Sequence, residues 1–326
     1  MKAVVTGGAG FIGTHLVERL LEDGLDVTVI DDFSTGRPDN LVHLSGRVTV
    51  APLDVTKFDD VLPLFDGASW VFHLAALADI VPSIERPLAY HRANVDGTVA
   101  VLEAARRSGA KRFVYTASSS CYGIPDSYPT PETAAIRPQY PYALNKWVGE
   151  QYALHWAHTY KLPVVSLRLF NVYGPRSRTS GTYGAVFGVF LAQKLNSRPF
   201  TVVGDGTQTR DFIFVSDVVE AFVAAARSDV VGAAFNVGSG RPVSVNRLAE
   251  LLGGPVVHVP KRPGEPDRTH AGITAIERAL GWKPLTAFED GVRIMLEHID
   301  YWRDAPVWTP AAIDQATREW FRYLSR

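Results

Sequence analysis

A strand, a glycine-rich turn and a helix follow one another at the start of this chain, and this order constrains the fold more than any other feature. The β-rich run Lys2-Ala-Val-Val-Thr6 is followed by Gly7, Gly10 and Gly13 and then by an amphipathic stretch. Glycines let the backbone approach a pyrophosphate closely, and the N-terminus of the helix attracts its negative charge. The pattern therefore predicts a dinucleotide-binding βαβ unit.

Short β-rich runs alternate with helical patterns through the first half of the chain, which is typical of a parallel sheet with crossover helices. The expected strands are Lys2–Thr6, Val27–Ile30, Val48–Ala51, Trp70–Leu74, Arg112–Ala117 and Val164–Leu169. The expected helices are Ile12–Glu22, Asn94–Ser108 and Tyr142–Tyr160. We therefore predict an α/β fold with a Rossmann-type, doubly wound parallel sheet.

The second half of the chain has smaller helical and β-rich pieces, which favour a smaller αβ substrate-binding lobe. Its expected elements are Ala185–Leu195, Phe200–Val203, Asp211–Val215, Asp217–Ala226, Val245–Leu252, Val256–Val259, Leu296–Trp302 and Pro310–Leu324. We expect the dinucleotide-binding domain to span residues 1–170, with residues from about 210 to 235 packing back on it. The substrate lobe would then span residues 171–326 and be interleaved with the first domain.

Charge and cysteine content exclude several classes of function. The net charge is −1, so no basic field favours nucleic acid or an acidic membrane. Cys121 is the only cysteine, which excludes an intrachain disulfide and a Cys-ligated metal site, and we expect no metal. No signal peptide and no apolar run of about 18 residues is found. We therefore expect a cytoplasmic protein with no nucleic-acid or membrane partner.

Acidic residues at the ends of two expected strands predict how the dinucleotide is held. Asp31 and Asp32 end the second strand, where a carboxylate accepts hydrogen bonds from the adenosine ribose and repels a 2′-phosphate. This favours NAD over NADP, with Asp31 as the ribose ligand, although one of the two acids could instead cap a turn. Asp54 follows the third strand and is predicted either to reach the adenine or to cap a helix.

Tyr142 and Lys146 are four residues apart in Pro141-Tyr-Ala-Leu-Asn-Lys146, which would place them on one face of a helix. A cation beside the hydroxyl favours phenolate, so tyrosine can act as a base near neutral pH. Pro141 suits the first helical position, and the helix dipole would lower the pKa of Tyr142 further. The pair predicts redox use of the bound dinucleotide.

Many ordered motifs together make the chain similar to the extended short-chain dehydrogenases/reductases, and within them to the nucleotide-sugar epimerase/dehydratase group. They are Thr6-Gly-Gly-Ala-Gly-Phe-Ile-Gly13, His73-Leu-Ala-Ala76, Asn94-Val-Asp-Gly-Thr98, Ser118-Ser-Ser-Cys-Tyr-Gly123, Pro141–Lys146, Arg168-Leu-Phe-Asn-Val-Tyr-Gly-Pro175, Thr209-Arg-Asp-Phe-Ile-Phe-Val-Ser-Asp217 and Arg262-Pro-Gly-Glu265. The resemblance extends over almost the whole chain.

The resemblance implies NAD as the cofactor and assigns catalytic roles. Tyr142 would be the base, Lys146 would bind the nicotinamide ribose, and Ser118 would help to move the proton; a strand-end hydroxyl that bonds the backbone is the alternative for Ser118. The cofactor-binding residues would be Gly7, Gly10, Phe11, Ile12, Gly13, Asp31, Asp32, Asp54, Val55, Leu74, Ala75, Ala76, Asn94, Tyr142 and Lys146.

The two residues after Ser118 indicate which reaction of the group to expect. By the resemblance, sugar dehydratases of the group carry an Asp-Glu pair at these two positions, and decarboxylases carry a Glu. This chain has Ser119 and Ser120 there instead. Without a carboxylate at these positions, the resemblance implies epimerisation at carbon 4. Tyr142 would take the proton of the 4-hydroxyl, and hydride would pass to NAD and return to the opposite face of a 4-keto sugar. A reductase, a dehydratase or decarboxylase, and a dinucleotide-sensing regulator are the alternatives.

The resemblance also implies a UDP-sugar substrate. Asn171 and Arg210 would bind the diphosphate, with Arg262 and Glu265 on phosphate and ribose, although Arg210 could instead pair with the adjacent Asp211. Thr269 matches a position that is a bulky Tyr in galactose-restricted epimerases. Further substrate-site residues would be Ser119, Ser120 and Arg178, the last at a position that holds a sugar carboxylate in glucuronate 4-epimerases. UDP-glucose/galactose is favoured, with UDP-glucuronate and UDP-N-acetylglucosamine as alternatives.

A homodimer is a further expectation from the resemblance, because members of the group pair through a four-helix bundle. Here the bundle would use the helices Asn94–Ser108 and Tyr142–Tyr160. Its contact face would comprise Ala100, Val101, Ala104, Trp147 and Ala157, and packing of these residues against the protein's own sheet is the alternative.

Overall fold

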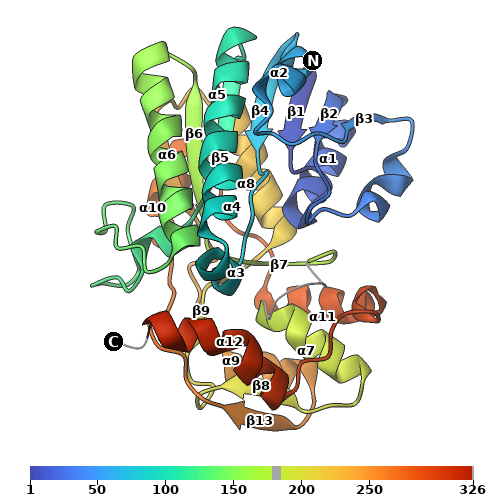
Figure 1. Cartoon of the computed structure of the whole chain (residues 1–326), viewed down its shortest axis with the longest axis vertical. Helices are drawn as coiled ribbons and strands as arrows, with labels where there is room; N and C mark the ends of the chain where they lie inside the picture. The colour runs from blue at the N-terminus through green and yellow to red at the C-terminus, as the bar shows by residue number, and fades with distance from the viewer. Residues whose placement is uncertain (178–184, 325–326) are drawn as a thin grey trace.

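The computed structural model describes residues 1–177 and 185–324, and it forms a large lobe around a parallel sheet with a smaller lobe beneath it (Figure 1). Seven strands pair in the order β11-β6-β5-β4-β1-β2-β3, all in parallel. Their bounds are β1 Lys2–Thr6, β2 Asp26–Ile30, β3 Val48–Ala51, β4 Ala68–His73, β5 Arg112–Ser118, β6 Val164–Leu169 and β11 Ala233–Val237. The predicted Rossmann-type fold is confirmed. Its strand order reverses between β1 and β4, the point where such sheets bind ligands.

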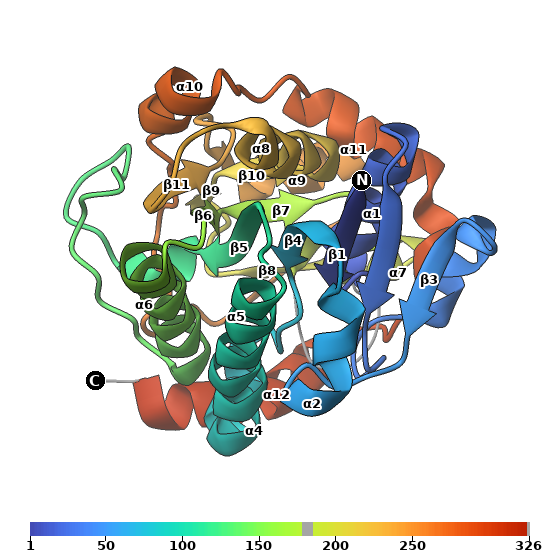
Figure 2. The same cartoon turned by 90° about the horizontal axis from the view of Figure 1, so that it is seen from above.

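Helices cover both faces of the sheet, as the view from above shows (Figure 2). Helices α1 (Phe11–Glu22) and α8 (Val215–Arg227) bury one face, while α5 (Gly97–Arg107) and α6 (Pro141–Tyr160) bury the other. Pro141 occupies the first turn of α6, as predicted. The shorter helices near the sheet are α2 Phe58–Val61, α3 Ile80–Glu85, α4 Pro87–His91 and α10 Thr274–Leu280.

The smaller lobe has its own apolar core, built largely from aromatic rings. Tyr173 stacks on Phe187 with centroids 4.5 Å apart, and Phe212 stacks on Phe288 at 5.3 Å. The elements are β7 Asn171–Tyr173, α7 Val186–Leu195, β8 Phe200–Val203, β9 Thr209–Arg210, β10 Phe212–Phe214, β12 Val243–Ser244, α9 Val245–Leu252, β13 Val256–Val259, α11 Phe288–Glu297 and α12 Pro310–Leu324. The segment expected as one helix over Leu296–Trp302 is helical but divided, because α11 ends at Glu297 and a 3₁₀ helix follows over Ile299–Trp302.

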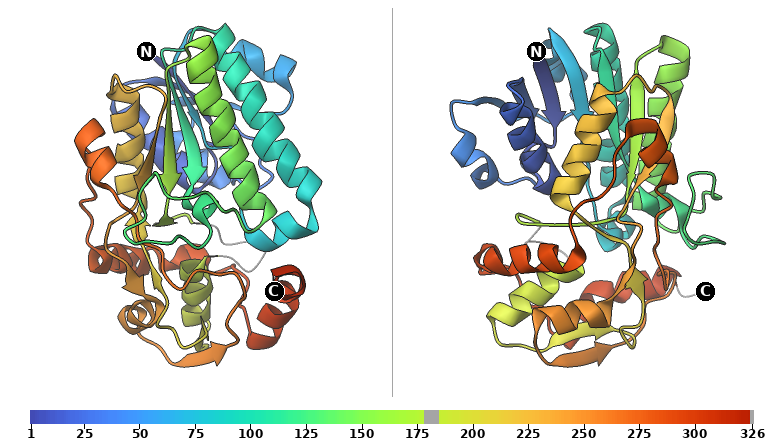
Figure 3. Two further views of the ribbon diagram at one scale, coloured as in Figure 1. Left: turned by 90° about the vertical axis from the view of Figure 1, so that its left-hand side faces the viewer. Right: turned by 180° about the vertical axis from the view of Figure 1, so that it is seen from behind.

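The chain crosses between the lobes more than once. After β10 it returns to the sheet, where α8 packs against α1 and β11 pairs with β6. Two side views show this part of the chain and α10 beside the sheet, with the other C-terminal helices at the smaller lobe (Figure 3). The expected domain boundary at residue 170 stays a prediction, because packing alone does not show which part folds independently.

Several residues assigned to a dimer face lie inside the protein's own core. Val101, Ala104 and Ala157 are buried against the sheet, so they pack internally and the assignment was wrong for them. The outward face of α6 instead exposes Leu144, at 45%, and Tyr152, at 38%. A homodimer stays a prediction. Over the described residues, no helix is both long enough and apolar enough to cross a membrane.

A buried histidine connects the first strands of the sheet to α5. The Nδ1 atom of His73 lies 2.7 Å from the Thr6 hydroxyl, and its Nε2 atom lies 3.0 Å from the Thr98 hydroxyl. Burial lowers the pKa of His73 to about 3, with a smaller contribution from the charge of Lys146. The ring is therefore neutral in the folded protein at ordinary pH.

We predict that His73→Gln flattens the pH dependence of stability. An unfolded histidine takes up a proton below its ordinary pKa of 6.5, whereas the folded one does so only near pH 3. Stability is therefore lost as pH falls through this window, by about 2 kcal/mol of unfolding free energy between pH 7 and pH 5. Urea unfolding of the wild type and of His73→Gln at pH 5 and at pH 7 measures this change in unfolding free energy. If the unfolding free energies of the two proteins differed by the same amount at pH 5 and at pH 7, this role of His73 would be contradicted.

Candidate active site

A cleft of about 360 Å³ lies where β1, β2 and β4 end, with both lobes contributing to its walls. The smaller lobe supplies Val189, Tyr301 and Trp308 among others. Most of the residues expected to bind the cofactor line this cleft: Gly7, Gly10, Phe11, Ile12, Gly13, Asp31, Asp32, Asp54, Val55, Leu74, Ala75 and Ala76. Their position at the switch point of the sheet fits a dinucleotide.

The glycine turn is packed so tightly that no side chain fits at Gly7 or Gly13. Gly7 has φ +73°, and a Cβ atom there would lie 2.6 Å from the backbone nitrogen of Ala75. A Cβ atom on Gly13 would lie 2.1 Å from the carbonyl oxygen of Gly7. The turn and the first turn of α1 can therefore present backbone N–H groups to a pyrophosphate without obstruction, so the residues present fit NAD.

Asp31 is anchored to the glycine turn at the rim of the cleft. It accepts hydrogen bonds of 2.9 Å from the backbone N–H groups of Ala9 and Phe33, and burial raises its pKa. Asp32 accepts from the backbone and hydroxyl of Ser34, so it closes a turn and also lines the cleft. The Asp54 carboxylate accepts a hydrogen bond from the N–H of Thr56. Because α2 begins only at Phe58, with Lys57 at its N-cap, Asp54 does not cap this helix, and that alternative was wrong.

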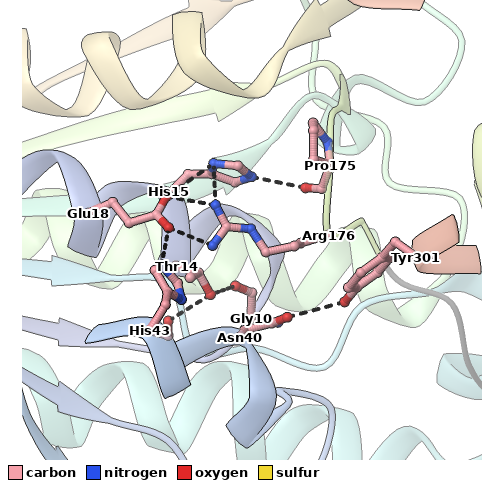
Figure 4. Close-up of polar contacts among 10 residues, drawn as sticks. Gly10, Thr14, His15, Glu18, Asn40, His43, Pro175, Arg176 and Tyr301 are labelled. Atoms are coloured by element: carbon pink, nitrogen blue, oxygen red, sulfur yellow. Dashed lines mark hydrogen bonds and ion pairs between the residues drawn. The ribbon is translucent and has the colours of Figure 1, made fainter. Parts of the chain in front are cut away.

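The two lobes are joined beside the cleft by polar contacts that sequence reasoning missed (Figure 4). Arg176 donates to both carboxylate oxygens of Glu18 at 2.7 Å and to Nδ1 of His15 at 3.1 Å. Burial and the nearby Arg176 charge lower the pKa of His15, whose neutral ring donates from Nε2 to the Pro175 carbonyl. Tyr301 donates to the side-chain oxygen of Asn40 at 3.2 Å.

Ser118 and Tyr142 meet at the end of β5 and the start of α6. Ser118 ends β5, and its hydroxyl lies 2.8 Å from that of Ser120 and accepts from the Ser120 N–H. Burial raises the pKa of Tyr142, hydrogen bonding with Ser118 lowers it, and the charge of Asp79 raises it. The expected lowering of the Tyr142 pKa is therefore wrong for this structure, because desolvation outweighs the other effects.

Lys146 lies deep beside the same strand. Its ammonium group is 4.6 Å from the centroid of the Tyr115 ring, and burial lowers its pKa to about 7 while Glu150 opposes the shift. Asn94 is also buried, and its side chain bonds both the N–H and the carbonyl of Leu77. Asn94 thus supports the loop after β4 rather than lining the cleft. NAD contacts of Asn94, Lys146 and Tyr142 stay predictions.

The residues predicted to hold the diphosphate lie together in the smaller lobe. Arg210 donates to Glu265 at 2.8 Å, and Arg262 lies 3.9 Å from the same carboxylate. Asn171 accepts a 2.8 Å hydrogen bond from the hydroxyl of Thr269. Their contact with a substrate stays a prediction, and Arg178 lies outside the described residues.

Asp211 does not pair with Arg210, so that alternative was wrong. Asp211 is fully buried, and its carboxylate accepts from the backbone N–H groups of Ser239, Gly240 and Ala271. These bonds and the Ser239 hydroxyl satisfy the charge locally, which leaves the Arg210 guanidinium directed to Glu265.

Comparison with known proteins identifies the family. The model of the NAD dependent epimerase/dehydratase family matches residues 3–238. The chain belongs to this family. NAD is accordingly its cofactor, which agrees with the fit of the cleft.

Three relatives show the range of activities nearby. UDP-glucose 4-epimerase of Mycolicibacterium smegmatis is 38% identical, over 91% of this chain and 98% of the relative. UDP-glucuronic acid decarboxylase 1 of Arabidopsis thaliana is 35% identical, over 91% of this chain and 69% of the relative. The structure of UDP-glucuronic acid 4-epimerase from Bacillus cereus with UDP-glucuronic acid and NAD superposes with TM-score 0.85, at 30% identity over 92% of this chain and 99% of that one. Family membership alone therefore does not separate epimerase from decarboxylase.

We predict that Gly13→Ala weakens NAD binding. The added Cβ atom would lie 2.1 Å from the Gly7 carbonyl oxygen, so the turn must open. Affinity should fall roughly tenfold or more, since tenfold corresponds to only about 1.4 kcal/mol. The NAD content of the purified protein and a titration with added NAD measure this loss of affinity.

Gly24→Ala is the matched control, since Gly24 has φ +75° and no neighbour within 4 Å of its added Cβ atom. It strains a turn outside the cleft and should cost stability while leaving NAD content unchanged. Full NAD occupancy in Gly13→Ala would show that the turn tolerates a side chain and that the predicted site is wrong.

Proposed function

We propose that this protein catalyses NAD-dependent epimerisation at carbon 4 of a UDP-hexose of the UDP-glucose/UDP-galactose type, through a transient 4-keto sugar. The observation that carries the proposal is the Ser118–Tyr142 pair at the end of β5, followed by Ser119 and Ser120 where lyases of the group carry carboxylates. Serine hydroxyls cannot serve as the acid and base that elimination or decarboxylation requires. This arrangement favours a reaction with one base.

The proposed mechanism assigns one proton transfer to Tyr142. In its phenolate form, the Tyr142 oxygen takes the proton of the sugar 4-hydroxyl to become the phenol, and it gives that proton back after the 4-keto sugar has turned over; Ser118 is the neighbouring hydroxyl. Held by the glycine turn and Asp31, bound NAD would supply the hydride acceptor and donor for carbon 4. Lys146 is the cation on the same helix, and its buried position suits a contact with the cofactor ribose.

The arginines of the smaller lobe would hold the substrate while the sugar turns. Arg210 and Arg262 converge on Glu265, and guanidinium groups match the geometry of phosphate oxygens. A fixed diphosphate allows the hexose to rotate without the nucleotide leaving its site. UDP is the proposed nucleotide by analogy with the relatives.

The sugar is proposed as glucose or galactose, with glucuronate and N-acetylglucosamine as alternatives. Thr269 stands where galactose-restricted epimerases have a bulky Tyr, and a smaller side chain is compatible with an N-acetyl group. The hydroxyl of Thr269 is committed to Asn171 and to the backbone N–H of Asp211.

A lyase is the second candidate, because one carboxylate does approach the base. Asp79 lines the cleft, and its charge raises the pKa of Tyr142. Asp79 precedes α3 with φ +82°, a conformation that is strained for a residue other than glycine. Product analysis separates the two reactions.

We predict that Tyr142→Phe lowers kcat by roughly two to four orders of magnitude, the usual contribution of a positioned acid–base group. NAD content should stay near that of the wild type, because the ring remains. Steady-state turnover and cofactor content of the same preparations measure both. Tyr152→Phe is the control, since Tyr152 is on the same helix and is 38% exposed. Near-normal turnover of Tyr142→Phe would refute the mechanism.

We also predict the product. Proton NMR of separate incubations with UDP-glucose, UDP-glucuronate and UDP-N-acetylglucosamine, without added NAD, should show a galacto anomeric signal in the UDP-glucose tube. The same signal in another tube would reassign the sugar. A 4-keto or pentose product would instead establish the lyase and point to Asp79. No conversion in any tube, even after NAD is supplied, would refute a UDP-sugar 4-epimerase.

A further inference from the structure

The C-terminal helix α12 lies across the smaller lobe and packs beneath α3 (Figures 1 and 3). Trp320 on this helix is only 4% exposed. Its indole N–H donates to the carbonyl oxygen of Pro263 at 2.7 Å. The bond fixes the ring against the segment that carries Arg262 and Glu265.

The face of the Trp320 ring supports Arg262. The guanidinium carbon of Arg262 lies 5.4 Å from the ring centroid, a cation–π distance. On its other side Arg262 is 3.9 Å from Glu265, which also accepts from Arg210. A carboxylate occupies guanidinium N–H groups, whereas an aromatic face attracts the cation without using them. The ring therefore restrains Arg262 without itself occupying the guanidinium N–H groups.

The same ring reaches toward the catalytic helix through Tyr140. The Tyr140 and Trp320 centroids are 6.4 Å apart, and Tyr140 is nearly parallel to Tyr142 at 6.5 Å. Burial raises the pKa of Tyr140, and Tyr142 and Glu265 contribute to the shift. Trp320 thus lies between Arg262, proposed to bind the diphosphate, and Tyr142, the proposed base. The Tyr140 ring separates it from Tyr142.

We propose that α12 is part of the nucleotide-sugar site, and that Trp320 is a positioning residue that holds Arg262 for the diphosphate. This inference rests on the proposed function, since it needs a nucleoside diphosphate as ligand. Because Trp320 acts on Arg262 and is one ring away from Tyr142, it contributes to substrate affinity and little to the chemical step.

The test measures UDP binding to the NAD-loaded protein by calorimetry. Trp320→Ala should weaken UDP binding about tenfold, as expected for loss of a buried cation–π contact and one hydrogen bond. KM for the UDP-sugar should rise by a similar factor while kcat stays within about twofold and NAD content is unchanged. Trp320→Phe keeps an aromatic face and should recover part of the affinity. Tyr323→Ala is the control on the same helix, because Tyr323 is 53% exposed.

A double-mutant cycle separates positioning from general support of the fold. If Trp320 acts through Arg262, Trp320→Ala should add almost nothing to the loss already caused by Arg262→Ala. An undiminished additional loss would overturn the positioning role, as would wild-type affinity in Trp320→Ala. Failure of the wild-type protein to bind UDP would instead refute the proposed function itself.

Discussion

A buried ion pair between α6 and β6 sets the position of the helix that carries Tyr142 and Lys146. The Arg168 guanidinium donates to both carboxylate oxygens of Glu150, one at 2.6 Å, and Glu150 is 1% exposed. Removing either partner would leave a buried charge, at a cost of about 3–5 kcal/mol. Because Glu150 is one helical turn beyond Lys146, the pair fixes how far α6 can slide along the sheet and hence which residue meets Ser118.

The same arginine extends this constraint to the far edge of the sheet. Arg168 donates to the Tyr122 hydroxyl at 2.7 Å, and Tyr122 donates to the side chain of Asn236 on β11 at 2.7 Å. The loop after Ser118 and the strand that follows the return from the smaller lobe are therefore held by one polar network. Buried networks that are fully paired favour a single arrangement over near alternatives.

The sequence predicted those parts of the site that depend on local spacing. The glycine turn, the Tyr142–Lys146 helix and the acids after β2 each lie within a few residues, so their geometry follows from strand and helix periods. The contacts that sequence reasoning missed join distant residues: Arg176 is 158 positions from Glu18, and Tyr301 is 261 positions from Asn40. No local pattern encodes such pairs. The Tyr142 pKa was predicted in the wrong direction for the same reason, since burial is a tertiary property.

Under the proposed function, the residues around the diphosphate and those around the reacting carbon meet opposite physical demands. An epimerase must hold the nucleotide firmly yet let the sugar present both faces of carbon 4 to one hydride site. The diphosphate end is built from paired charges, with Arg210 and Arg262 around Glu265. The reacting end has the short hydroxyls of Ser118 and Ser120. Short side chains take up little room, which suits a sugar that has to turn over. Rigidity at the arginines and space at the serines are therefore two requirements of one reaction.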